Sequence, residues 1–213
     1  MADSSIVLRI EKLCFAYPQG QLFDRLSANI PAGLSLICGG EGRGKTTLLR
    51  LLSGEMSAHS GTIKINDVLL SSEASGYRQQ VFWADPSTES FENLTPLQYF
   101  DTLRLRYPGF PGAAARPLQE LLDGLGLEPH LAKPMYMLST GSKRKVWLAA
   151  AFAADTAVTL LDDPFAALDK VSIEFVLRQL RQFVKSPMHA CLLTGYEAPD
   201  DLSLALIVDL DQH

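Results

Sequence analysis

The 213-residue chain has 47% hydrophobic and 20% charged residues, the balance of a packed globular protein. Its formal net charge of -5 argues against attraction to a nucleic acid backbone, so no nucleic-acid partner is expected. Neither a secretory signal nor an apolar run long enough to cross a bilayer is visible. Any membrane role is therefore expected to come through a partner.

The first half of the chain alternates strand-like segments with one helix. Residues 6–17 and 22–30 predict strands separated by a turn at 18–21. Residues 34–40 are a short apolar run that ends in two glycines, and they predict a buried strand. Residues 45–54 predict a helix closed by Gly54, and residues 60–67 and 79–85 are further strand candidates.

The pattern changes near Asp85. Residues 95–107 and 116–127 have apolar residues at helical spacing, which predicts a helical lobe over about 86–137. From Ser139 the pattern is helix, strand, helix, strand, at 142–155, 157–163, 171–184 and 189–195, with a last strand at 204–210. This alternation predicts an α/β fold whose mainly parallel sheet has helices on both faces.

Three cysteines, Cys14, Cys38 and Cys191, have apolar neighbours at strand-like positions. Their spacing fits no metal or redox motif. We expect buried, reduced thiols, which is consistent with a reducing compartment. The basic run at residues 143–145 is expected to be a solvated helix face.

Residues 39–46 read GGEGRGKT and fit the G-x-x-x-x-G-K-[ST] pattern of a phosphate-binding loop. Glycines let successive N–H groups converge on phosphate oxygens, and the helix that follows directs its positive end at the same anion. Lys45 is expected to meet the terminal phosphates and Thr46 to bind Mg²⁺. An accidental glycine-rich turn is the alternative, but the strand before and the helix after it favour the phosphate loop. The nucleotide-binding residues expected here are Gly39, Gly40, Glu41, Gly42, Arg43, Gly44, Lys45, Thr46 and Thr47, with the Glu41 side chain pointing outward.

An acidic pair, Asp162 and Asp163, ends the apolar strand predicted at 157–163. In P-loop enzymes the first carboxylate at such a strand end holds Mg²⁺, directly or through water, and the second would lie near the attacking water. Two acids after a strand also fit a plain turn or a helix cap. Because a P-loop needs a metal-binding acid, we interpret Thr46 and Asp162 as metal ligands and Asp163, with Lys45, as catalytic.

Taken together, these residues resemble the nucleotide-binding subunits of ABC transporters. "GGEGRGKTT" resembles their Walker A loop, "LSTGS" (138–142) the LSGGQ signature, "TLLDDP" (159–164) the Walker B strand and catalytic position, and "AALD" (166–169) the D-loop. Tyr17 falls where the family places an aromatic residue that stacks on adenine. The order and spacing of these motifs match the family from near residue 6 to residue 197. The sequence of the helical lobe and of the signature is most similar to the ATPase subunits of ABC-2-type exporters, and haem-exporter ATPases are a near cousin.

The resemblance implies a P-loop NTPase fold of the ABC ATPase type, with an antiparallel β subdomain beside the parallel sheet. It implies one domain over 1–213, with a nucleotide-binding core at 1–85 and 138–213 and a helical lobe at 86–137. ATP and Mg²⁺ are the implied cofactors. Such subunits pair head to tail, so Ser139 and Gly141 would face the nucleotide on the opposite protomer of a homodimer or heterodimer. By itself, "LSTGS" also fits an ordinary capped helix start.

The implied partner is a transmembrane permease subunit that docks on the helical lobe. The chain would then be cytoplasmic and peripheral on the inner face of the cell membrane. Non-transport ABC ATPases that act on DNA or the ribosome commonly have a second nucleotide domain or a long coiled coil, and neither is visible. A P-loop kinase would leave "LSTGS" and "AALD" unexplained.

Three residues that the resemblance predicts are missing. Asp85 or Pro86 falls where a Gln is expected, and Gly195 or Tyr196 where the switch His is expected. Asp163 replaces a Glu and is shorter by one methylene; a displacement of about an ångström near the chemistry can reduce the rate by about a hundredfold. We therefore expect ready ATP binding with slow hydrolysis in an exporter subunit. The alternative is a regulatory module in which nucleotide holds a dimer closed.

Overall fold

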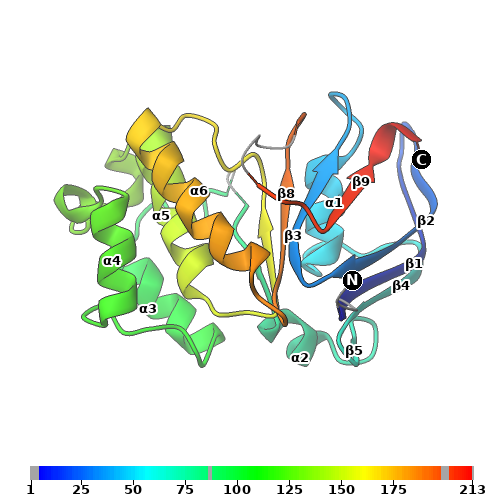
Figure 1. Ribbon diagram of the computed structural model, residues 1–213, viewed down its shortest axis with the longest axis horizontal. Helices are drawn as coiled ribbons and strands as arrows, with labels where there is room; N and C mark the ends of the chain where they lie inside the picture. The colour runs from blue at the N-terminus through cyan, green and yellow to red at the C-terminus, as the bar shows by residue number, and fades with distance from the viewer. Residues whose placement is uncertain (1–4, 86–87, 198–201, 213) are drawn as a thin grey trace. The chain divides into compact units, whose positions relative to one another are not determined.

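The computed structural model describes residues 5–85, 88–197 and 202–212 (Figure 1). Two compact units share the chain. The sheet unit consists of Met1–Trp83, Ala157–Asp162 and Leu180–His213, and the helical unit of Ala84–Thr156 and Asp163–Gln179. Helix α5 and most of α6 thus group with the helical unit, so this unit is larger than the lobe expected at 86–137. The assignment of all 213 residues to one ABC ATPase domain stays a prediction.

The sheet unit contains an antiparallel and a parallel sheet. The antiparallel sheet has the strand order β2-β1-β4-β5, with β1 (Ile6–Tyr17), β2 (Gly20–Pro31), β4 (Ser60–Ile65) and β5 (Val68–Leu69). The parallel sheet has the order β6-β7-β8-β3-β9, with β3 (Gly33–Cys38), β6 (Val81–Trp83), β7 (Val158–Leu161), β8 (Ala190–Thr194) and β9 (Leu206–Asp209).

Burial explains why these sequences form these strands. In β7 and β8 every residue is buried, so their sequences VTLL and ACLLT are nearly continuous apolar runs. Strand β1 instead mixes buried and exposed positions, as expected of an antiparallel strand with one face toward solvent. Helix α1 (Lys45–Leu52) contributes four buried leucines to a core that both sheets share.

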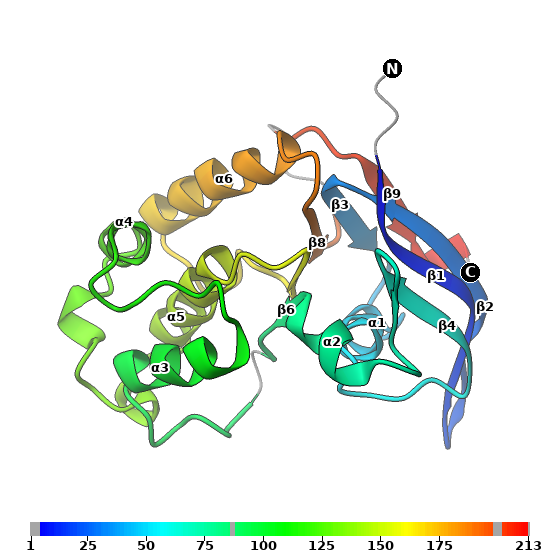
Figure 2. The ribbon, with the colours of Figure 1, turned by 90° about the horizontal axis from the view of Figure 1, so that it is seen from below.

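The helical unit packs α3 (Pro96–Arg106) and α4 (Arg116–Gly124) against α5 (Thr140–Ala153), as Figures 1 and 2 show. A capping box begins α3, since Thr95 Oγ1 accepts from the Gln98 amide at 3.2 Å and Gln98 Oε1 accepts from the Thr95 amide at 2.9 Å. The Trp147 ring of α5 meets the Tyr99 ring of α3 edge to face at 4.8 Å. Helix α6 (Lys170–Val184) begins in this unit.

The helices and strands expected from the sequence are present, with ends that differ by a few residues. The expectations omitted helix α2 (Ala74–Gln79), strand β5, and the 3-10 turns η1 (Glu128–His130), η2 (Met135–Met137) and η3 (Leu210–Gln212). Over the three described ranges, no helix has the length and hydropathy that crossing a membrane requires.

The cysteines depart in part from expectation. All three are free thiols, but only Cys191 is buried, and the expectation of burial is wrong for Cys14 and Cys38, which are half-buried. Cys14 lies in β1 at a register shift, where its sulfur accepts from the Arg25 amide at 3.3 Å. Partial burial, together with the negative charge of Asp209, raises the pKa of the Cys38 thiol.

Candidate nucleotide-binding site

The phosphate loop joins the end of β3 to the start of α1, as expected for a P-loop. Gly44 precedes α1 with φ +91°, in the left-handed region that favours glycine. A Cβ there would lie 2.8 Å from Leu22 Cδ2 and 2.9 Å from Phe23 Cζ, so these two side chains would also have to shift to admit any other residue. The first amides of α1 thus open directly onto the loop and can bind an anion.

Lys45 is folded back onto its own loop. Its Nζ donates to the Gly39 carbonyl at 2.6 Å and to the Gly40 carbonyl at 2.9 Å. The same ammonium group lies 4.7 Å from the ring centroid of Tyr196. To reach the terminal phosphates of a nucleotide, the ammonium would have to leave these partners.

The two expected metal ligands are hydrogen-bonded to each other. The Thr46 hydroxyl donates to Asp162 Oδ2 at 2.6 Å, directly after β7. The hydroxyl of Thr194, at the end of β8, donates to Asp162 Oδ1 at 2.6 Å. Hydroxyl and carboxylate oxygens are hard donors, and Mg²⁺ in nucleotide sites takes few protein ligands beside water and phosphate oxygens. The pair Thr46 and Asp162 therefore fits Mg²⁺, and Thr194 holds the carboxylate in place.

Tyr17 lies near the same loop. Its hydroxyl is 3.1 Å from the Thr47 hydroxyl, and its ring meets Phe15 edge to face at 5.0 Å. Tyr17 is 38% exposed, so its ring is packed against Phe15 and still partly accessible to solvent. The sheet unit thus brings together Tyr17, the P-loop and Asp162.

A second set of contacts at the loop was not visible in the sequence. Asp211, in η3, accepts from the Gly40 amide at 3.0 Å and from Arg43 Nε at 2.7 Å, and its own carbonyl accepts from Arg43 Nη2 at 3.1 Å. About half of each charged side chain is exposed, and an exposed ion pair contributes only about 1 kcal/mol or less. These contacts therefore fix the position of η3 against the loop but contribute little to the free energy of folding. Glu41 is exposed, as expected.

The signature residues lie in the helical unit. Ser139 is the N-cap of α5, and its hydroxyl accepts from the Ser142 amide at 3.1 Å. The capped helix start weighed for "LSTGS" is therefore the local structure, and it is compatible with phosphate binding by the same helix end. A Cβ on Gly141 would overlap the carbonyl oxygen of Ala167, so the signature turn and the D-loop are packed backbone to backbone.

Helix α5 also fixes the segment from Asp163 to Asp169. Asp163 is exposed, with φ +44°, and its carbonyl accepts a hydrogen bond from Arg144 Nη1. Lys145 Nζ donates to Asp169 Oδ2 at 2.6 Å, and Asp169 Oδ1 accepts from the Ser172 amide in the first turn of α6 at 2.9 Å.

The expectation that residues 143–145 form a solvated face is therefore wrong. Lys143 is paired with Glu92 at 2.5 and 2.7 Å, and both side chains are only about a quarter exposed. Arg144 donates a hydrogen bond to the Asp163 carbonyl, and Lys145 donates one to the Asp169 carboxylate. A run of like charges looked solvated because its partners are distant in sequence.

The D-loop carboxylate gives a testable pH dependence. Hydrogen bonds from Lys145 and from the Ser172 amide hold the pKa of Asp169 well below its ordinary value. Because the pKa is lower in the folded state, the stability that Asp169 contributes is present above the unfolded pKa of about 3.9 and is lost as the pH falls below it. We expect Asp169→Ala to lower the free energy of unfolding by about 1 kcal/mol at neutral pH, the usual effect of losing a helix cap.

Denaturant unfolding of wild type and Asp169→Ala at neutral pH and at about pH 3 measures this effect. The difference between the two proteins should shrink at the lower pH. Asp67→Ala, at a fully exposed carboxylate, is the matched control and should show no such change. A difference for Asp169→Ala that is the same at both pH values would contradict the assigned contacts.

A parallel sheet, a glycine-rich loop between strand and helix, and an acid at the end of the neighbouring strand define the class of P-loop nucleotide-binding ATPases. Residues 23–166, more than half of the chain, match the family model described as "ABC transporter". The chain belongs to this family, as an ATP-binding subunit. The resemblance read from the motifs and the expected ABC ATPase fold are both confirmed.

Two relatives and one solved structure illustrate the match. The cytochrome c biogenesis ATP-binding export protein CcmA of Pseudomonas syringae pv. syringae is 34% identical over 163 residues, which are 76% of this chain and 75% of that protein. The cobalt import ATP-binding protein CbiO of Rhodobacter capsulatus is 35% identical over 192 residues, 82% of this chain and 64% of that protein. A dimeric ATP-binding cassette bound to ADP and Pi has a TM-score of 0.74 at 19% identity, covers 89% of this chain and 88% of its own, and supports the fold alone.

Proposed function

We propose that the chain is the energy-coupling subunit of a membrane exporter, and that it binds Mg·ATP readily but hydrolyses ATP slowly. The observation that carries this proposal is the contrast between two sets of residues. In support of binding, the sheet unit holds the P-loop between β3 and α1, with Lys45 bonded to the Gly39 carbonyl and Thr46 bonded to Asp162. Asp163, by contrast, has the shorter side chain, and Tyr196 stands near the position of the switch His.

The roles of the residues follow from their chemistry. The amides of residues 39–47 hold the phosphates, and the exposed ring of Tyr17 stacks on the base. Thr46 and Asp162 supply oxygen ligands to Mg²⁺, which when bound neutralises the phosphate charge. Asp163 orients the attacking water from too short a reach, which is our reason for expecting slow turnover.

The signature residues would complete the site of a second subunit. Ser139 and Gly141 stand at the N-terminus of α5, where the helix dipole favours an anion and where the missing Cβ of Gly141 lets backbones approach closely. Pairing of this kind is what the resemblance to ABC ATPase subunits implies, and it is part of the proposal. Both a homodimer and a heterodimer with a more complete ATPase subunit fit this proposal.

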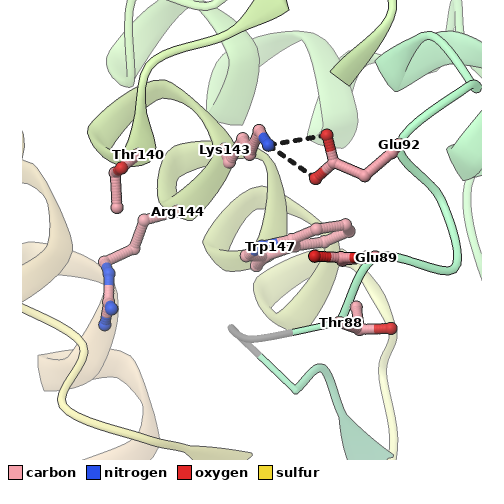
Figure 3. Close-up of a pocket in the computed structure, with 7 residues that line it drawn as sticks. All are labelled: Thr88, Glu89, Glu92, Thr140, Lys143, Arg144 and Trp147. Carbon is pink, nitrogen blue, oxygen red and sulfur yellow. Dashed lines mark hydrogen bonds and ion pairs between the residues drawn. The ribbon is translucent and has the colours of Figure 1, made fainter. Parts of the chain in front are cut away.

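The partner would be a permease subunit that places this chain at the inner face of the cell membrane. The helical unit has a cavity of about 220 Å³ beside the Lys143–Glu92 pair (Figure 3), lined by Thr88, Glu89, Glu92, Thr140, Lys143, Arg144 and Trp147. Its paired charges and the edge of an indole suit a short amphipathic helix of such a permease. The export direction is supported by the sequence of the helical lobe, which resembles exporter subunits, and by the name of the CcmA relative. The CbiO relative, by contrast, is named as an import protein.

The alternative function, a regulatory module, differs in turnover. We expect calorimetric titration to show saturable, Mg²⁺-dependent ATP binding, and a phosphate-release assay to show slow turnover that Asp162→Asn abolishes. In the regulatory alternative, Asp163→Asn would change only the lifetime of the closed dimer and not the turnover. Brisk turnover by the isolated chain would contradict the proposal of slow hydrolysis.

A further inference from the structure

The aromatic ring of Tyr196 lies over the ammonium group of Lys45, with 4.7 Å between Nζ and the ring centroid. Tyr196 is 72% exposed, so burial in the core does not explain where its ring lies. The backbone just before it is fixed, because the Gly195 amide donates to the Ile37 carbonyl of β3 at 3.2 Å. This hydrogen bond keeps Tyr196 beside the strand that leads into the P-loop.

Within the described ranges, the Lys45 ammonium also contacts two carbonyl oxygens of its own loop. Nζ donates to Gly39 at 2.6 Å and to Gly40 at 2.9 Å. A ring face attracts a cation through its quadrupole, and the carbonyl dipoles attract it from the loop side. The ring and the two carbonyls together hold the ammonium in one place.

We propose that Tyr196 is a positioning residue that acts through Lys45. In the nucleotide-free protein its ring holds the ammonium against the Gly39 and Gly40 carbonyls, and it thereby competes with the terminal phosphates for the lysine. This inference rests on the proposed function, because the competitor is the phosphate of a bound nucleotide. A charge-assisted bond to phosphate is stronger than an exposed cation–π contact, so the ring adjusts nucleotide affinity and does not block binding.

The first experiment needs no nucleotide. A double-mutant cycle with Tyr196→Leu and Lys45→Met, measured by denaturant unfolding, should show coupling of about two- to fivefold in the unfolding equilibrium constant. Tyr196→Phe keeps the ring and should behave like wild type. Tyr136→Leu, which alters another exposed tyrosine, is the matched control and should not couple to Lys45.

The second experiment measures the Kd for Mg·ATP. Tyr196→Leu should bind about two- to fivefold more tightly than wild type, and Tyr196→Phe should bind like wild type. Absence of coupling in the cycle overturns the proposal at its base. Coupling with an unchanged Kd in Tyr196→Leu overturns the competition. If the cycle shows coupling but no variant binds ATP, the proposed function and the competition are both overturned. Only the contact between the Tyr196 and Lys45 side chains then remains.

Discussion

Replacing Asp163 with Glu should raise the rate of Mg·ATP hydrolysis by about a hundredfold, because it restores the methylene that brings the carboxylate toward the water. Contacts of the Asp163 backbone restrain it from moving to compensate for the short side chain. Asp163 has φ +44°, and its carbonyl is held by Arg144 of α5. From this anchor a longer side chain extends the reach of the carboxylate.

Phosphate release at saturating Mg·ATP measures this effect. Asp163→Asn should fall below wild type, since it loses the charge that orients the water. Asp123→Glu makes the same change at an exposed carboxylate of α4 and should leave the rate unchanged. If Asp163→Glu turns over at the wild-type rate, the short side chain does not limit hydrolysis.

Gly141→Ala should reduce ATP-dependent pairing and turnover by about a hundredfold while leaving the binding of ATP to the P-loop nearly unchanged. A Cβ at Gly141 would overlap the carbonyl oxygen of Ala167, which is backbone and cannot rotate away. Ala167 itself has φ +59°, a conformation with little freedom to adjust. The signature turn or the segment from 163 to 169 must therefore shift, and either shift displaces residues assigned to the composite site.

The Kd for Mg·ATP and the ATP-dependent dimer fraction, determined on the same sample, separate the two effects. Gly109→Ala is the matched substitution in the helical unit, because a Cβ there meets only Asp155 at 3.9 Å, an ordinary contact. It should change neither quantity. If Gly141→Ala pairs as well as wild type, the close packing of Gly141 on Ala167 has no part in assembly.

The parts of the site that could be predicted from the sequence are those encoded within short segments. The P-loop is contiguous, and its glycines, lysine and threonine carry their chemistry in their spacing. Strands such as VTLL can be predicted because both faces of a parallel sheet are buried, so the strand is a nearly continuous apolar run. Helix α2 was not predicted because only Tyr77 of its six residues is buried, so it has no apolar periodicity.

The parts that could not be predicted depend on residues brought together by the fold. Asp211 meets Arg43 across 168 positions of the sequence, and no local pattern in either segment indicates this contact. The stack of Tyr196 on Lys45 depends on where β8 ends relative to the P-loop. The unit to which α5 belongs is a further example. Because α5 follows the predicted lobe and precedes a strand, the sequence favoured the nucleotide-binding core. Its contacts with α3 and α4 group it with the helical unit.

The central claim is that a triphosphate held by the P-loop of one subunit is closed over by the signature turn of its mate. A diazirine side chain placed at Thr140, an exposed position of the signature, tests this in the complex purified with its native partners. After irradiation with Mg·ATP, mass spectrometry should find Thr140 linked to a glycine-rich phosphate loop of a second subunit, either residues 39–47 of another copy or the loop of a different ATPase. Links that stay within the same chain, or that are identical with and without Mg·ATP, would contradict the claim.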